Sequence, residues 1–445
     1  MTFFQKGLCV SAGQISSIVL GLISTMILAR ALGKAGMGKY DLVRQVGILA
    51  ITFFSLGIGN ASIYLLNKDR EDRPEVINLV VRLLLVLMPL LFLGITGLFL
   101  AFPRYFGDLP VLIAVIFGIG VSALLAINAL RGLYVAWLNV KHILIADILP
   151  SIIMVAGALV LWVLKELDTG WALSIYATGN LLSLLTLLYG IKRSISTKTT
   201  VSLRLIKRAL SIGWKLLASN VFQVLTPALA VLVFRYKTMD AQGFGIVGLY
   251  TRASALCGLA MLLPSTFGPL LYSKWSSLVG DEQNRNFEFV VRMSIAYGAT
   301  IAALLLVFGR YALLVVYGKE YIQAQQAIYS LIPSILLFGA VSAFINYFAS
   351  IGKPGVTAVL LAISSAVTIV LTSILVPKIG LLGPGTALSI SQLFIIIVFV
   401  VLARKSRRIN ISSALILKRD DLSLLFSQMK KSLISGSSYT DSNRN

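Results

Sequence analysis

Twelve apolar stretches follow one another between residues 8 and 403, and they leave little room for any other kind of structure. About 20 apolar residues in a helix span the hydrocarbon layer of a bilayer, which is roughly 30 Å thick. Lipid offers no partner to a free backbone amide, so each stretch is predicted to be a membrane-spanning helix. The stretches lie near residues 8–32, 42–66, 83–103, 110–136, 144–164, 171–191, 212–234, 247–271, 292–309, 325–349, 355–376 and 384–403.

The composition is that of a membrane protein rather than a soluble one. The chain is 58% hydrophobic and only 13% charged, whereas soluble domains carry about 25% charged residues. The first apolar stretch follows Lys6 and has no small-residue cleavage site. We therefore expect a retained span there rather than a removable signal peptide.

Parts of the first half of the chain recur in the second half at an offset of 210 residues. The sequence Val-Val-Arg occurs at 80–82 and again at 290–292, and Gly-Xaa-Tyr occurs at 38–40 and again at 248–250. Six spans per half is an even number, so both halves are predicted to cross the membrane in the same direction. A substrate path is expected at the interface of such repeats, which is the layout of a transporter.

We therefore expect an all-α polytopic membrane protein built from two parallel six-helix repeats. Residues 1–195 form the N-terminal six-helix lobe, and residues 212–403 form the C-terminal lobe. Residues 196–215 are predicted to be an amphipathic linker on the cytoplasmic membrane surface. Residues 404–445 form a basic tail whose apolar positions recur every few residues, as in a helix lying on anionic lipid.

The net charge of +22 is explained by membrane topology and does not require a nucleic-acid partner. With a cytoplasmic N-terminus, roughly two-thirds of the 39 Lys and Arg residues fall in cytoplasmic segments, as the positive-inside rule requires. Both termini are therefore predicted to be cytoplasmic. The five Trp residues all fall near predicted span ends, where we expect their rings at the interface: Trp137, Trp162, Trp171, Trp214 and Trp275.

The sequence offers no site for bond-breaking chemistry. The connections between spans are short, and no GxxxxGK[ST] phosphate-binding loop occurs. Cys9 and Cys257 stand singly within apolar stretches, and they have no metal-ligand spacing with His142, the one histidine. We expect both thiols to be packing residues, and we expect no cofactor, no metal and no enzymatic activity.

Five arginines are the candidates for binding an anionic substrate. Arg44 lies one helical turn beyond Tyr40, and Arg252 lies half a turn beyond Tyr250, so each sits in the first turns of a corresponding span. Two cations at the same level are predicted to line a shared cavity that holds an anion, with snorkelling to the interface as the alternative. The five candidates are Arg44, Arg252, Arg30, Arg235 and Arg131.

Acidic residues are scarce in the spans. The sequence places only Asp147 inside a span and Asp41 at an edge. Arg131 is expected to pair with Asp147, and the alternative is that Arg131 meets an anionic head group. Proton- or sodium-coupled carriers usually bury carboxylates, so this scarcity disfavours a cation-drug antiporter.

Seven amide side chains interrupt the apolar stretches. They are predicted either to face a hydrated path or to hydrogen-bond between helices, and the sequence leaves both readings open. These residues are Gln14, Asn60, Asn180, Asn220, Gln223, Asn346 and Gln392.

Four motifs in order resemble those of polysaccharide flippases in the multidrug/oligosaccharidyl-lipid/polysaccharide (MOP) exporter superfamily. Ala-Arg-Ala-Leu-Gly at 29–33, followed by 38–40, is similar to the first external turn of these flippases, and 248–250 is similar to its counterpart in the second half. Tyr-Gly-Lys-Glu-Tyr at 317–321 resembles their segment between spans 9 and 10. Residues 376–383, with Pro-Lys-Ile-Gly and a later Gly, resemble the segment between spans 11 and 12.

The resemblance implies two lobes that alternate between inward- and outward-facing states. It implies a flippase that moves undecaprenyl-diphosphate-linked oligosaccharide repeat units to the outer leaflet of the bacterial plasma membrane, for O-antigen, capsule or exopolysaccharide. The implied partners are this lipid-linked oligosaccharide, membrane lipids, and the polysaccharide polymerase and glycosyltransferases. The alternatives are a cation-coupled drug or small-molecule antiporter of the same superfamily and a membrane-embedded polysaccharide polymerase.

The predicted topology is open to a direct test with single-cysteine labelling in intact cells. Because the span count and the charge distribution agree, positions 70, 199, 284 and 435 should be protected from a membrane-impermeant reagent. Positions 108, 168, 238 and 319 should react with it. A reproducible inversion at one position would mean that a span has been miscounted.

Overall fold

The computed structural model describes residues 3–67, 73–137, 139–192, 201–239, 243–278 and 280–407. Within these ranges the regular structure is entirely helical. Helices satisfy their own backbone amides and carbonyls, which is what a long apolar chain in lipid requires. The prediction of an all-helical membrane protein is confirmed.

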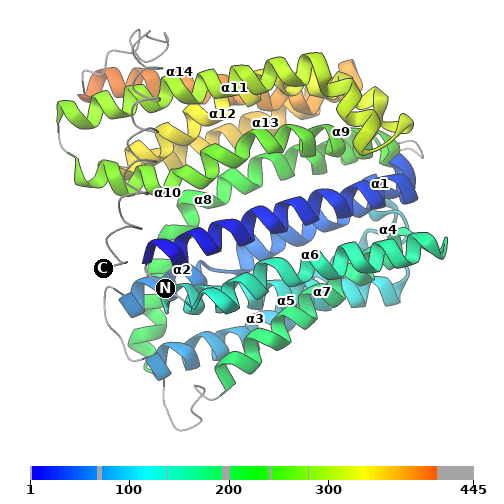
Figure 1. Ribbon diagram of the computed structural model, residues 1–445, viewed down its shortest axis with the longest axis horizontal. Coiled ribbons are helices and arrows are strands. Elements are labelled where there is room, and N and C mark those ends of the chain that lie inside the picture. Colours follow the sequence, from blue (N-terminus) through cyan, green and yellow to red (C-terminus); the bar gives the residue numbers. More distant parts are fainter. Residues whose placement is uncertain are drawn as a thin grey trace, which may run out of the picture.

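The helices fall into two groups, in the lower and upper parts of Figure 1, and the first turns of the helix at 203–237 reach down beside the lower group. We call them the N-terminal and C-terminal lobes. The N-terminal lobe contains α1 (Phe3–Phe54), α2 (Ile58–Asn67), α3 (Arg73–Ala101), α4 (Pro103–Phe106), α5 (Val111–Ala136), α6 (Val140–Val163) and α7 (Thr169–Ile191). Its core forms where α1 packs on α6 and where α5 packs on α3 and α7.

The C-terminal lobe is built from α-helices and three short 3-10 segments. It contains α8 (Leu203–Lys237), α9 (Gly243–Gly258), η2 (Leu259–Met261), α10 (Leu262–Ser277), α11 (Asp281–Val316), η3 (Lys319–Ala324), α12 (Gln325–Ser350), α13 (Pro354–Ile379), η4 (Gly380–Leu382) and α14 (Gly383–Arg407). Helix α12 packs on α11 and α14, and α13 packs on α8 and α14.

In the described residues, nine helical stretches are long and apolar enough to cross a membrane. Two of them, Ser16–Asn67 and Gly355–Leu402, have 52 and 48 residues. Each of these two covers a pair of predicted spans, so it is long enough for two crossings. The predicted span at 212–234 lies within α8 but is not among the nine. The chain is a multi-pass membrane protein, while the count of twelve crossings and the repeat stay predictions.

Helix α1 reverses direction at Gly33. The backbone of Gly33 has φ 63° and ψ 179°, which breaks the helix between two long arms. A positive φ is accessible to glycine because it has no Cβ, so the turn needs this residue. We call the end of the bundle that holds Gly33 the turn end; the sequence predicts that this end faces outside.

The two lobes meet where the second arm of α1 crosses α9, a surface we call the seam. Gly38 and Gly248, which are related by the 210-residue offset, lie against each other there. A Cβ on Gly38 would lie 1.9 Å from the Phe244 carbonyl oxygen, and one on Gly248 would lie 2.0 Å from the Lys34 carbonyl oxygen. Any larger residue would therefore force the two backbones apart.

Two predicted surface features lie differently from expectation. The end of the predicted linker is not a separate surface helix, because residues 203–215 form the first turns of α8. Trp275 is not an interfacial ring, because it is fully buried against Phe287 and donates its indole N–H to Asn286 Oδ1 at 2.9 Å. Side chains of α11 and α12, Phe287 and Tyr347, pack against the ring and cover it. The tail beyond Arg407 lies outside the described residues.

Substitution of Gly38 or Gly248 by Ala should separate the lobes at the turn end, because either Cβ would overlap a backbone carbonyl. Spin labels at Glu166 and Lys319, one on each lobe, should report a longer distance by pulsed electron resonance. Gly94→Ala is the matched control, because a Cβ there meets no atom within 4 Å. Unchanged distances in both seam variants would show that the helices absorb the methyl group without opening.

Candidate functional site

A cavity of about 240 Å³ lies at the seam and brings together the two predicted arginines. Arg44 reaches it from α1 and Arg252 from α9. The full lining is Asp41, Arg44, Gln45, Pro227, Val231, Tyr250, Thr251, Arg252, Ser254 and Ala255. Both arginines therefore line one cavity, and their role in binding an anion is a proposal.

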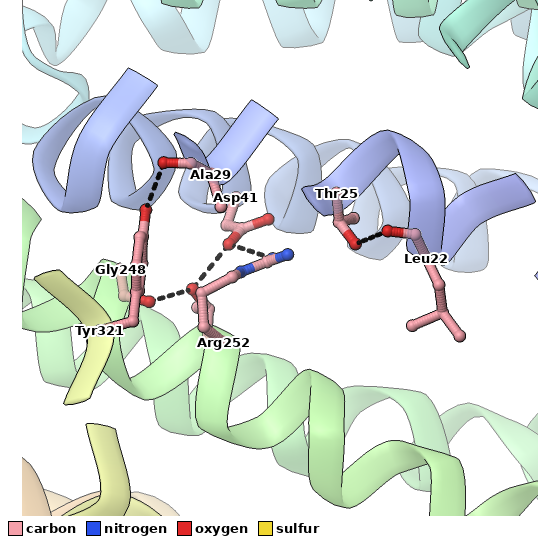
Figure 2. Close-up of polar contacts among 8 residues, drawn as sticks. Leu22, Thr25, Ala29, Asp41, Gly248, Arg252 and Tyr321 are labelled. Atoms are coloured by element: carbon pink, nitrogen blue, oxygen red, sulfur yellow. Dashed lines mark hydrogen bonds and ion pairs between the residues drawn. The ribbon is translucent and has the colours of Figure 1, made fainter. Parts of the chain in front are cut away.

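A buried ion pair crosses the seam inside this site. The Asp41 carboxylate accepts from Arg252 Nη2 at 2.5 Å and from the Thr251 hydroxyl at 2.6 Å (Figure 2). The side chains of Asp41 and Arg252 are 5% and 2% exposed. Removing one partner of such a pair strands a charge away from water, at a cost of about 3–5 kcal/mol.

Several polar atoms of this ion pair make no hydrogen bond with the described residues. Asp41 Oδ1 and the Nε and Nη1 groups of Arg252 are buried and have no hydrogen-bond partner in the described part of the chain. Arg44 Nε is likewise buried and unpartnered. Buried polar groups without partners are costly, and the unpartnered groups here are three arginine nitrogens that can donate and one carboxylate oxygen that can accept.

The charges in the cavity do not balance. Among its lining residues, two guanidinium groups face one carboxylate, which leaves a net positive charge. The carbon at the centre of the Arg44 guanidinium lies 6.0 Å from the Tyr40 ring centroid, and that of Arg252 lies 5.5 Å from the Tyr317 ring. Aromatic faces support cations at such distances without supplying a hydrogen bond. The site therefore favours an anion with several acceptor oxygens.

Arg30 and Arg235 lie outside the cavity. Arg30 is exposed at the turn end and donates to the Val315 carbonyl of α11. Arg235 is buried and donates to the carbonyls of Arg104, Tyr105 and Thr238. These contacts tie the lobes together, so neither residue is included in the proposed anion site.

A second hydrogen bond joins the same two helices, α8 and α4, in the opposite direction. The Tyr105 hydroxyl donates to the Leu232 carbonyl at 2.6 Å. Burial raises the pKa of Tyr105, which keeps the phenol protonated as a donor. The Arg235 guanidinium also stacks on Phe244, 3.7 Å from the ring centroid. Helix α8 is thereby fixed to α4 at the turn end.

Arg131 pairs with Asp147, as the sequence predicted. The two side chains meet at 2.9 Å and are 32% and 15% exposed. Arg131 also lines a different cavity, in the N-terminal lobe. The pairing confirms the first of the two readings that the sequence left open.

Sequence reasoning missed Asp41, which it placed at a span edge. The 210-residue offset relates Asp41 to Thr251, and the structure shows that these two residues are in contact. In the second half of the chain, the position that corresponds to Asp41 is Thr251, which is next to Arg252. This correspondence could have indicated that Asp41 forms an ion pair across the seam. The contact of Tyr105 with α8 had no such indication, because α4 has only four residues.

Long apolar helices in two lobes define a multi-pass membrane protein. Residues 3–271, more than half of the chain, match the family of polysaccharide biosynthesis proteins. The chain belongs to this family, which confirms the resemblance seen in its sequence motifs. No curated protein matches the chain at the level of sequence.

Several solved structures are similar in fold to this chain. The chain is similar to the lipid II flippase MurJ in an inward closed conformation, with a TM-score of 0.69 and 15% identity, over 94% of this chain and 92% of that one. It is similar to a multidrug resistance MATE family transporter of the MOP superfamily in an inward-facing conformation, with a TM-score of 0.68 and 16% identity, over 87% and 94%. An outward-facing MATE structure gives 0.59 at 16% identity, over 89% and 94%. The likeness shows the fold, and the solved proteins that share it are a lipid II flippase and MATE transporters.

The Asp41–Arg252 pair should show strong thermodynamic coupling. Asp41→Asn alone leaves a buried guanidinium without its counter-charge, so the melting temperature of the purified protein should fall. The Asp41→Asn/Arg252→Gln double variant should melt higher than the sum of the two single effects predicts. The same cycle on Arg131 and Asp147 is the control, because that pair is more exposed and should couple weakly.

Proposed function

We propose that this protein translocates undecaprenyl-diphosphate-linked oligosaccharide repeat units from the inner to the outer leaflet of the bacterial plasma membrane. The observation that carries the proposal is the cavity at the seam in which Arg44 and Arg252 meet. A diphosphate supplies the oxygens that the unpartnered N–H groups of these arginines require. Family membership supports a role in polysaccharide biosynthesis.

The proposed mechanism uses competition for Arg252. The diphosphate oxygens bind Arg44 and Arg252 and take over the guanidinium that Asp41 otherwise holds. Loss of the ion pair weakens the seam at the turn end, where Tyr321 also donates to the Ala29 carbonyl at 3.2 Å (Figure 2). The substrate thus promotes the opening through which it leaves. A ligand shifts such an equilibrium only by binding one state more tightly, and competition with Asp41 supplies that difference.

The direction of transport follows from charge and topology. We propose that the turn end faces outside and that both termini face the cytoplasm. Outward movement of an anion across an inside-negative membrane is favourable by about 2.3 kcal/mol per charge per 100 mV. The flipped units then meet the polymerase that assembles O-antigen, capsule or exopolysaccharide, after glycosyltransferases have built them on the inner face.

The second candidate function is export of amphipathic drugs, and one observation favours it. A cavity of about 350 Å³ in the C-terminal lobe is lined mostly by apolar side chains, among them Phe222, Met261 and Phe338. It shares Pro227 and Ser254 with the cationic cavity. An apolar drug fits such a lining, whereas a cationic drug is disfavoured by the two arginines.

Complementation of a flippase-deficient strain tests the flippase. Ala at Arg44 or Arg252 should reduce surface polysaccharide by about tenfold or more at matched membrane abundance, because a charged hydrogen bond to the diphosphate is lost. Lys should rescue in part, because it keeps the charge but not the bidentate fork. Glu should be worst, because it repels the linker.

Arg310→Ala is the matched control, because this arginine is exposed on α11 and far in sequence from the seam. Normal export by every Arg44 and Arg252 variant would contradict the proposed diphosphate site. Failure of the wild-type chain to restore polysaccharide in strains with different repeat units, together with a gain in drug resistance, would favour the drug exporter.

A further inference from the structure

A second polar cavity, separate from the one at the seam, surrounds a break in a predicted membrane span. Helix α1 ends at Phe54 and α2 begins at Ile58, both within the predicted span 42–66. Leu56 and Gly57 between them have positive φ values of 45° and 67°. Non-helical backbone at membrane depth is stable only where protein buries it or where it lines a hydrated cavity.

The cavity measures about 340 Å³ and lies in the N-terminal lobe. Its walls are the end of α1, the break, α2 and α5. Gly59 and Gly132 bring α2 and α5 into backbone contact, since a Cβ on Gly132 would lie 2.2 Å from the Gly59 carbonyl oxygen. The lining is Ile51, Thr52, Ser55, Gly57, Gly59, Asn60, Ile63, Asn128, Ala129, Arg131, Gly132 and Val135.

Two carboxamides in this cavity are free to bind a ligand. Asn60 and Asn128 are exposed, although Asn60 follows the break within an apolar stretch of membrane-spanning length and Asn128 lies in the long apolar helix α5. Neither side chain makes a hydrogen bond with any described residue of the chain. An unpaired amide facing hydrocarbon costs several kcal/mol, so two of them on one cavity wall indicate a polar occupant.

The lining suits a neutral, hydroxyl-rich ligand. A carboxamide both donates and accepts hydrogen bonds, as sugar hydroxyls do. Arg131 adds a buried, unpartnered Nε–H, while Asp147 balances its charge. The cavity thus differs in kind from the cationic one at the seam, where positive charge is in excess.

The two cavities lie on the same arm of α1. Arg44 lines the first and Thr52 the second, and eight residues of helix correspond to roughly 12 Å. The second cavity lies farther from the turn end. In a lipid-linked oligosaccharide the glycan is attached directly to the diphosphate, so a glycan held in the second cavity leaves the diphosphate within reach of the first.

We infer that this cavity is a glycan subsite, in which Asn60 and Asn128 bind sugar hydroxyls of the lipid-linked oligosaccharide while Arg44 and Arg252 bind its diphosphate. The inference rests on the proposed flippase function and adds a second point of recognition. It assigns selection among repeat units to the N-terminal lobe. The seam then recognises the linker that all such substrates share.

Binding to the purified full-length protein in nanodiscs separates the two subsites. The probes are undecaprenyl diphosphate alone and undecaprenyl diphosphate carrying a trisaccharide, in a panel of three different trisaccharides. Asn60→Ala/Asn128→Ala should weaken the best trisaccharide probe by about tenfold and leave the sugar-free probe unchanged. Arg44→Ala should weaken both probes. Asn346→Ala is the matched control, because this amide already donates to the Ser342 carbonyl of its own helix.

The sugar-free probe also reports whether each variant is folded, because it needs only the seam. If the wild-type protein binds the sugar-free probe but the asparagine double variant binds all trisaccharide probes normally, the glycan subsite is refuted and the flippase stands. If the wild type binds no trisaccharide more tightly than the sugar-free lipid, the glycan subsite is refuted as well. If the wild type binds neither kind of probe, the proposed flippase itself fails.

Discussion

The ion pair between Asp41 and Arg252 is the interaction on which the closed seam depends. It forms only because Gly38 and Gly248 let the α1 and α9 backbones touch, which excludes water from the two charges. A charge pair removed from water offsets its desolvation only when the geometry is good and both partners stay. Under the proposed mechanism the seam therefore alternates between a closed state with the ion pair formed and an open state with the ion pair broken.

Much of the fold follows from the periodic distribution of apolar residues. Apolar stretches of bilayer length favour helices, so the predicted spans are mostly helical in the described chain, although 42–66 is broken between Phe54 and Ile58. The sequence also placed Arg44 and Arg252 at one level, because their spans begin with the same Gly-Xaa-Tyr pattern. Burial of Trp275 was not predictable, since position near a helix end does not reveal whether a neighbouring helix covers that end.

The sequence identified only some of the residues that line the candidate site. Charge alone identified five arginines, but charge does not distinguish Arg235, which donates to carbonyls, from Arg44, whose Nε has no partner among the described residues. Long-range packing makes that distinction. The amide side chains that interrupt the predicted spans also differ in their surroundings. Asn60 lines a cavity, Asn180 is buried, and Asn346 donates a hydrogen bond within its own helix. The side chains of Gln14, Asn220 and Gln223 lie outside the described part of the structure.

The length and the contacts of helix α8 limit how the two lobes can move relative to each other. It runs unbroken from Leu203 to Lys237, with Gly213 against the Leu56 carbonyl near one end and Arg235 fixed to α4 near the other. A helix that is fixed near both ends must bend if one lobe rotates relative to the other. Its weakest point is Pro227, which cannot supply a backbone hydrogen bond. Pro227 also lines the cationic cavity, so under the proposed mechanism the helix would bend at the turn that the substrate contacts.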